Sequence, residues 1–246
     1  MKRILIIGAT SAIATECARI WAKEQSQFFL VARDLQKLSE ISADLEARGV
    51  SKVCQYAMDA TNIDDHKSML EACISEFHQI DIALIAHGTL PDQQNCERDV
   101  ELTLKEISSN GTSVIALLTI FAAQFEKQKC GSIAVISSVA GDRGRPSNYV
   151  YGAAKAAVST FCEGLRARMF KVGVSLTTIK PGFVDTPMTK GLNLPPQLLS
   201  TPQKVATQIV AAIHRRDNTI YTPKFWSFIM VIIRLVPAFI FKRANL

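Results

Sequence analysis

The sequence predicts one doubly wound α/β domain, and three observations support this prediction. Short, continuously apolar runs alternate strictly with helical patterns, as in parallel strands that are buried on both faces and connected by helices. The 246 residues are 48% hydrophobic, which is sufficient for one well-buried core. No internal boundary and no low-complexity segment divides the chain.

The first half of the chain contains four of the predicted strands. The first apolar run leads into the glycine-bearing turn Gly8–Ala14 and then into a helix that extends to about residue 24. After the second run, Asp34 is the expected N-cap of an amphipathic helix over residues 35–47, which Gly49 ends. A further helix extends to about residue 77. The strands are expected at residues 4–7, 28–32, 53–57 and 82–86.

The second half continues the alternation. A long helical tract covers roughly residues 100–127. Its interior contains Asn110-Gly111, and both residues are poor helix formers, so this pair indicates either a kink or residues that are kept for function. A fifth strand (133–136), a helix to about residue 170 and a sixth strand (174–179) follow, and Pro181-Gly182 is expected to close that strand.

Charge and cysteine usage restrict the function classes. Residues 214–246 contain six lysines or arginines and one acidic residue, so this segment carries +5 and the rest of the chain +1 of the net +6. Basic charge confined to the tail disfavours a nucleic-acid surface. The six scattered cysteines indicate reduced thiols rather than zinc or disulfides, and the N-terminus is too short before its glycine for a signal peptide. We therefore expect a cytoplasmic protein.

One stretch carries a candidate acid–base pair. Tyr151 and Lys155 are four residues apart in a predicted helix and share one face, and Ser137-Ser138 precede them at the end of a strand. A lysine beside a tyrosine is expected to lower the tyrosine pKa, as a proton donor to a carbonyl requires. The same spacing also occurs by chance on surface helices.

The first turn and the second strand suggest a dinucleotide. A strand followed by a glycine-bearing turn and a helix N-terminus offers backbone N–H groups to a pyrophosphate, although a plain strand–turn–helix is the alternative. Ala12 and Ala14 replace glycines, which is tolerable if their φ angles stay negative. Arg33 follows the neutral Ala32 and suits a 2′-phosphate, which favours NADPH over NADH; a solvated surface arginine is the alternative.

In order and spacing, these motifs resemble the short-chain dehydrogenase/reductase family over nearly the whole chain. The matching elements are the Gly8–Ala14 turn, Asp59, Asn110, Ser138, Tyr151-Gly-Ala-Ala-Lys155 and Pro181-Gly-Phe-Val-Asp-Thr186. The resemblance implies one Rossmann-type domain over residues 1–222, with a seven-stranded, mostly parallel sheet and helices on both faces. It also implies an NAD(P)-dependent enzyme that reduces a ketone to a secondary alcohol by hydride transfer.

The resemblance assigns roles to individual residues. Tyr151 would be the general acid, Lys155 would lower its pKa and bind the nicotinamide ribose, and Ser138 would hold the substrate oxygen. Asn110 would distort its helix to hold a water that connects Lys155 to solvent. The implied cofactor-binding residues are Gly8, Thr10, Ser11, Ala12, Ile13, Arg33, Asp59, Ala60, His87, Gly88, Tyr151, Lys155, Pro181, Gly182, Val184 and Thr186.

Two of these positions have alternatives or departures from the family pattern. Asp59 would accept from the adenine amino group, whereas a simple helix cap is the alternative. Ile85-Ala-His-Gly88 stands where the family usually has Asn-Asn-Ala-Gly, so packing must compensate for Ile85. His87 lacks a partner cluster, and no metal site is expected.

The tail over residues 223–246 combines an apolar run with basic residues. The run over 225–241 is shorter than the ~20 residues of a spanning helix, and its broad apolar face suits contact with an anionic membrane surface. A helix packed across the substrate cleft, or an oligomer interface, are the alternatives. The tail also loosely resembles the branch of decaprenylphosphoryl-2-keto-ribose reductases. Residues 188–203, which are rich in leucine and proline, are expected to form a mobile substrate lid.

Several functions and partners therefore stay open. The leading prediction is an NADPH-dependent reductase of a lipid-linked keto-sugar or another hydrophobic ketone, peripheral on the inner membrane face. A soluble reductase of acyl or steroid-like ketones is a second enzyme prediction. From another class, a non-catalytic NADP-binding subunit of a membrane hetero-complex is the alternative. The resemblance also implies a homo-oligomer, and no nucleic acid is expected as a partner.

Overall fold

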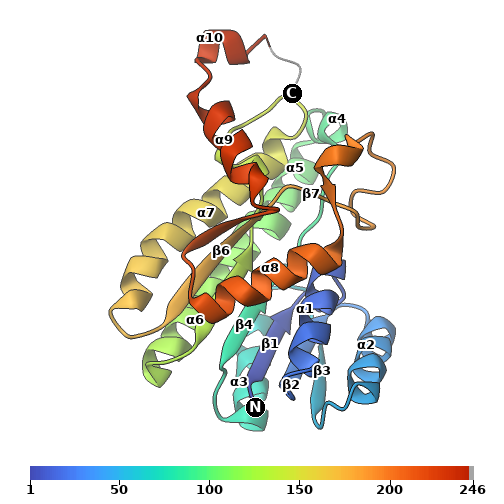
Figure 1. Cartoon of the computed structure of the whole chain (residues 1–246), viewed down its shortest axis with the longest axis vertical. Coiled ribbons are helices and arrows are strands. Elements are labelled where there is room, and N and C mark those ends of the chain that lie inside the picture. The colour runs from blue at the N-terminus through green and yellow to red at the C-terminus, as the bar shows by residue number, and fades with distance from the viewer. Residues whose placement is uncertain (244–246) are drawn as a thin grey trace.

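The computed structural model describes residues 1–243 and contains a seven-stranded sheet in the order β3-β2-β1-β4-β5-β6-β9 (Figure 1). Every neighbouring pair is parallel, so the expected mostly parallel sheet is parallel throughout. The strands are β1 (Arg3–Ile7), β2 (Gln27–Ala32), β3 (Val53–Ala57), β4 (Ile82–Ile85), β5 (Ser132–Ile136), β6 (Ser175–Pro181) and β9 (Thr219–Thr222).

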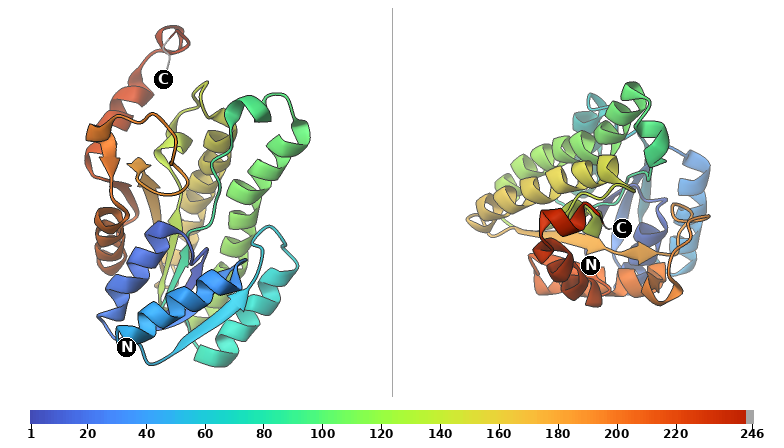
Figure 2. Two further views of the ribbon diagram at one scale, coloured as in Figure 1. Left: turned by 90° about the vertical axis from the view of Figure 1, so that its right-hand side faces the viewer. Right: turned by 90° about the horizontal axis from the view of Figure 1, so that it is seen from above.

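Helices cover both faces of this sheet (Figures 1 and 2). On one face, α1 (Ala12–Ala22), α2 (Leu35–Ala47) and α8 (Pro202–Arg215) bury one apolar cluster, which includes the fully buried Trp21. On the other face, α3 (Asp65–Phe77), α6 (Ser113–Gln128) and α7 (Tyr149–Phe170) bury a second cluster. Ile85 belongs to the second cluster and is 1% exposed, so packing does compensate for the missing family asparagine.

The long helical tract is interrupted where the sequence suggested. It consists of α5 (Val100–Ile107), a π-helical turn η1 (Ser108–Thr112) and α6, and Asn110 lies within that turn. The tract is long and apolar enough to cross a membrane by length and composition, but half of its most apolar window is buried inside the protein. Such burial is typical of a core helix. The short helix α4 (Gln93–Cys96) precedes it.

The segment expected to be a mobile lid is partly held in regular structure. Phe183–Val184 (β7) pairs with Leu199–Ser200 (β8), and α8 begins at Pro202. Residues 199–203 therefore do not belong to an open loop, and the irregular part of the segment ends with the short turn η3 (Pro196–Leu198).

The tail forms α9 (Phe225–Leu235) and α10 (Ala238–Phe241), which project from one end of the molecule (Figure 1). Trp226 and Met230 point inward and form a third apolar cluster with Val139. The last three residues of the predicted tail, 244–246, lie outside the described residues.

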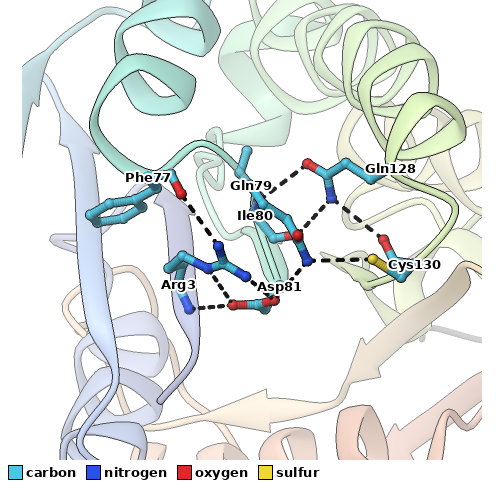
Figure 3. Close-up of polar contacts among 7 residues, drawn as sticks. All are labelled: Arg3, Phe77, Gln79, Ile80, Asp81, Gln128 and Cys130. Atoms are coloured by element: carbon cyan, nitrogen blue, oxygen red, sulfur yellow. Dashed lines mark hydrogen bonds and ion pairs between the residues drawn. The ribbon is translucent and has the colours of Figure 1, made fainter.

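A polar network holds together the end of the sheet where β1 and β4 begin (Figure 3). Arg3 on β1 donates from Nε and Nη2 to the two carboxylate oxygens of Asp81, at 2.8 and 3.0 Å. Gln128 at the end of α6 bonds both the backbone N–H and the carbonyl of Ile80. This network ties β1, the start of β4 and α6 together, away from the carboxyl ends of the strands.

Candidate active site

A large cavity lies at the carboxyl ends of the parallel strands, where open α/β sheets bind ligands. Its volume is about 1270 Å³. Within residues 1–243, all of the predicted site residues except Asn110 line it. These are Gly8, Thr10, Ser11, Ala12, Ile13, Arg33, Asp59, Ala60, His87, Gly88, Ser138, Tyr151, Lys155, Pro181, Gly182, Val184 and Thr186.

The turn after β1 has the features of a phosphate cradle. Gly8 has a φ of +77°, and a Cβ at this position would lie 2.5 Å from the backbone nitrogen of His87, so only glycine fits. Ser11 caps α1 by accepting from the N–H of Ala14 at 3.3 Å. Ala12 is helical and Ala14 lies inside α1, and neither has a positive φ, so the two alanines do not strain the turn. The N-terminus of α1 therefore faces the cavity as expected.

Arg33 and Asp59 lie together at the ends of β2 and β3. The Arg33 side chain is 73% exposed, and its Nη1 is 3.9 Å from Oδ2 of Asp59. Asp59 also accepts from the backbone N–H and the hydroxyl of Thr61, and these bonds contribute to a lowered pKa of the Asp59 carboxyl. Asp59 thus fixes the turn that follows β3 and does not cap a helix, because the N-cap of α3 is Asp64, while Asp59 also lines the cavity. Arg33 is free enough to reach an anionic group there.

Tyr151 and Lys155 lie on one face of α7, with the Lys155 Nζ 5.6 Å from the centre of the tyrosine ring. Burial raises the pKa of Tyr151 to about 12, and a side-chain hydrogen bond with Ser138 offsets this only in part. The tyrosine pKa is therefore raised and not lowered as expected, because desolvation of the phenolate outweighs any stabilisation by Lys155. At neutral pH the hydroxyl stays protonated, which is the form that donates a proton.

Lys155 is itself strongly perturbed. The residue is 3% exposed, and burial lowers the pKa of its ammonium to about 8. Its Nζ donates to the carbonyl of Ile136 at 3.2 Å, which fixes the side chain toward the end of β5. A lysine with a pKa near neutrality changes charge easily, as expected in a catalytic site.

Asn110 lies behind the cavity wall rather than in it. Its Oδ1 accepts from the N–H of Thr89 at 2.9 Å, and its Nδ2 donates to the Thr89 hydroxyl and to Glu106. A Cβ at Gly88 would lie 2.8 Å from Asn110 Oδ1 and 3.4 Å from Lys155 Nζ. A side chain at position 88 would therefore collide with the asparagine amide and crowd the lysine ammonium, so glycine is required there.

His87, next to Gly88, has a hydrogen-bond acceptor that is unpaired within residues 1–243. The Ser113 hydroxyl donates to the carbonyl of Ser109, so His87 Nε2, 2.9 Å from that hydroxyl, must be the donor of their bond. Burial lowers the pKa of His87 to about 3, so the ring is neutral. Its Nδ1 then carries a lone pair and is buried without a partner among the described residues. An unpaired acceptor at the cavity wall indicates a place for a ligand hydroxyl.

The described residues, 1–243, contain no group of three or more His, Cys, Asp or Glu side chains that could hold a metal ion.

Sequence reasoning missed several residues around the cavity. The amide oxygen of Gln93 accepts from the N–H of Val150 and fixes the start of α7. Trp226 packs on the backbone of Gly182, where a Cβ would overlap the indole. Arg145 and Asn148 also line the cavity. No local sequence pattern could identify these residues. Gln93 and Trp226 contact residues that are distant in the sequence. Arg145 and Asn148 each carry a buried polar atom without a hydrogen-bond partner among the described residues.

Comparisons with known proteins identify the family. The sequence profile of the family described as "short chain dehydrogenase" matches residues 2–197. An uncharacterised oxidoreductase of Mycobacterium tuberculosis strain H37Rv is 33% identical over 240 residues, covering 98% of this chain and 96% of that protein. An uncharacterised oxidoreductase of Streptomyces coelicolor is 28% identical over 243 residues, covering 98% and 95%.

A solved structure supports the fold. A short chain dehydrogenase/reductase family protein superposes with a TM-score of 0.78 at 24% identity, covering 89% of this chain and 94% of that one. The same sheet and helix arrangement is therefore found in a protein of this family.

Proposed function

The chain belongs to the short-chain dehydrogenase/reductase family and is an NAD(P)-dependent oxidoreductase; from this premise we propose that it reduces a ketone to a secondary alcohol with NADPH. One observation supports the proposal most. Ser138, Tyr151 and Lys155 converge at one end of a cavity whose other end holds the Gly8 turn and Arg33.

The residues present fit the cofactor. The Gly8 turn and the capped N-terminus of α1 would hold the pyrophosphate, and Arg33 would hold a 2′-phosphate. His87 Nδ1 supplies an acceptor for a ribose hydroxyl. When bound, the nicotinamide supplies the hydride.

The protein residues supply the proton and the charge. The Tyr151 hydroxyl, which stays protonated at neutral pH, donates its proton to the carbonyl oxygen as negative charge develops there. The Ser138 hydroxyl would hold the same oxygen, and the Lys155 ammonium would stabilise the phenolate that forms. A water held by Asn110, as the family resemblance implies, would return a proton to Lys155.

The cavity supports a hydrophobic ketone, and a lipid-linked keto-sugar is one such substrate. Apolar side chains from the segment after β7 line the substrate end of the cavity: Met188, Leu192 and Leu194. A soluble acyl or steroid-like ketone is the second candidate that this lining favours. A non-catalytic cofactor-binding subunit has less support, because it gives no physical reason to keep Ser138, Tyr151 and Lys155 together.

A membrane surface is part of the proposal. Seven large apolar side chains on the tail are exposed: Phe225, Phe228, Val231, Ile232, Leu235, Phe239 and Ile240. Lys224, Arg234, Lys242 and Arg243 lie in the same segment, which has no acidic residue after Asp217. An apolar face rimmed only by cations complements an anionic lipid surface. The protein would thus lie peripherally on the cytoplasmic face, next to a lipidic substrate.

The experiment measures NADPH and NADH oxidation with a panel of ketones that range from short and polar to long and apolar. We expect turnover of the apolar ketones and faster turnover with NADPH. Arg33→Asp should weaken NADPH binding by about tenfold or more and leave NADH binding nearly unchanged. Equal losses for both cofactors would contradict the role of Arg33, and no turnover of any ketone would contradict the reductase activity.

A further inference from the structure

Two arginines in the loop between β5 and α7 have opposite environments. Arg143 Nη1 donates to carbonyls at the end of α9, including that of Val236 at 2.6 Å, and its guanidinium lies 3.7 Å from the centre of the Phe241 ring. These contacts satisfy the side chain and fix the tail helices to the body of the protein. The role of Arg143 is therefore structural.

Arg145, two residues later, has no such partners among residues 1–243. It lines the cavity together with Ser138 and Tyr151, and its Nη2 lies 3.6 Å from the Met230 sulfur, which is a weak acceptor. No carboxylate of residues 1–243 forms an ion pair with it, and its Nε is buried without a hydrogen-bond partner. The guanidinium is thus a cation in the cavity wall that no anion of the described residues pairs with.

The carboxylate of Asp142, which lies nearby, does not serve as the anionic partner of Arg145. The two oxygens of Asp142 already accept from Lys180 Nζ and from the Tyr221 hydroxyl, both at 2.6 Å. Burial lowers the pKa of Arg145, and Asp142 offsets that only in part. A partly buried charge without a partner is unfavourable, so this geometry favours an anion from a ligand.

A second unsatisfied atom belongs to the same loop. The Oδ1 of Asn148 is buried without a partner among the described residues, and Asn148 also lines the cavity. An amide oxygen of this kind accepts from a hydroxyl. The loop therefore offers one donor to an anion and one acceptor to a hydroxyl, on the cavity wall that carries Tyr151.

We propose that Arg145 binds an anionic group of the substrate, so that the ketone carries a phosphate or a carboxylate, with Asn148 accepting from a neighbouring hydroxyl. The apolar residues Met188, Leu192 and Leu194 line the same cavity, so the anion belongs to an amphipathic molecule. This inference rests on the proposed function, because it assigns the substrate class of that same site.

The test uses binding rather than turnover, so that it does not depend on the reaction. The NADP⁺-loaded protein, whose cofactor site is filled, is titrated calorimetrically with octyl phosphate, octanoate, octanol and inorganic phosphate. We expect at least one of the two octyl anions to bind about tenfold or more tightly than octanol. The stronger anion identifies phosphate or carboxylate, and inorganic phosphate should bind more weakly because it lacks the apolar chain.

Variants separate charge from packing. Arg145→Met keeps an apolar contact for Met230 and should reduce octyl-anion affinity about tenfold while octanol affinity stays unchanged. Arg145→Lys should retain part of the anion preference. Lys171→Met, which removes an exposed cation at the end of α7, should change nothing.

Two results would overturn the inference: equal affinity of wild type for octanol and both octyl anions, or unchanged anion binding in Arg145→Met. If ketones are reduced but no anion preference exists, the proposed function stands and this inference fails. If the anion binds but no ketone is reduced, the anion site stands and the proposed reductase activity fails.

Discussion

At the scale of single residues, burial sets the acid–base chemistry. The sequence places Tyr151 and Lys155 on one helix face, and the i, i+4 spacing sufficed for that prediction. It did not suffice for the pKa of either group. Desolvation depends on what the whole fold packs around a side chain, and it raises the tyrosine pKa while it lowers the lysine pKa.

This charge pattern predicts a pH dependence of the reaction. The Lys155 ammonium has a pKa of about 8, so it is charged below that pH and loses its charge above it. Its charge stabilises the phenolate formed when Tyr151 gives up its proton. We therefore expect kcat/KM for ketone reduction to be highest below pH 8 and to fall above it. Lys155→Met should be slow at every pH and lack this step; a wild-type profile that stays flat to pH 10 would contradict the assignment.

At the scale of elements, local sequence predicted most of the fold. The apolar runs located the first six strands, Gly8 located the turn after β1, and Asn110-Gly111 located the π-helical turn. Strand β9 was not located, because Thr-Ile-Tyr-Thr is short and half polar and is a strand only through its pairing with β6. The contact of Trp226 with Gly182 was equally hidden, because it joins segments far apart in the chain.

The Arg3–Asp81 pair predicts a stability effect at the end of the sheet away from the cavity. Burial acts to raise the pKa of the Asp81 carboxyl, but the hydrogen bonds from Arg3 outweigh it and the pKa is lowered below 3.8. A lowered carboxyl pKa gives stability that is present above the unfolded-state value and lost as the pH falls through the folded-state value.

Asp81→Asn should therefore reduce the free energy of unfolding at pH 7 by about 1–2 kcal/mol, since it breaks hydrogen bonds to a charged group. Denaturant unfolding measures this effect, and the difference in free energy of unfolding between wild type and variant should become smaller at acid pH. Glu76→Gln, which affects the more exposed pair with Lys52, should have a much smaller effect. A difference in free energy of unfolding that stays constant down to pH 2 would contradict an ionic origin of the Asp81 contribution.

At the scale of the whole molecule, the tail both packs against the body of the protein and exposes an apolar face. Trp226 and Met230 face inward while Phe228, Val231 and Leu235 are exposed, so α9 both packs on the body of the protein and presents an apolar face to its surroundings. Deleting the tail would remove both features at once. Substitutions on the exposed face separate them. A homo-oligomer formed through the long helices stays a prediction.

We expect the double variant Phe228→Ser and Leu235→Ser to lose co-sedimentation with vesicles that contain anionic lipid. These side chains are 69% and 76% exposed, so the fold should not change. Each exposed apolar side chain is worth about 1.5–3 kcal/mol when buried, so the loss in affinity should exceed tenfold. Phe170→Ser, an exposed apolar residue on α7, is the matched control. Wild type that sediments no better than the double variant would contradict membrane contact, and a change in oligomeric state instead would indicate a second copy.

The central claim is that Tyr151 is the proton donor of a reductase. The most direct measurement compares ketone-dependent NADPH oxidation by wild type and Tyr151→Phe, with NADPH affinity followed by fluorescence. Tyr149→Phe, which alters an exposed tyrosine two residues before Tyr151, is the control. We expect a rate lower by a factor of about 10²–10⁴ in Tyr151→Phe, with NADPH affinity nearly unchanged and Tyr149→Phe equal to wild type. A Tyr151→Phe variant that reduces the ketone at the wild-type rate would contradict this claim.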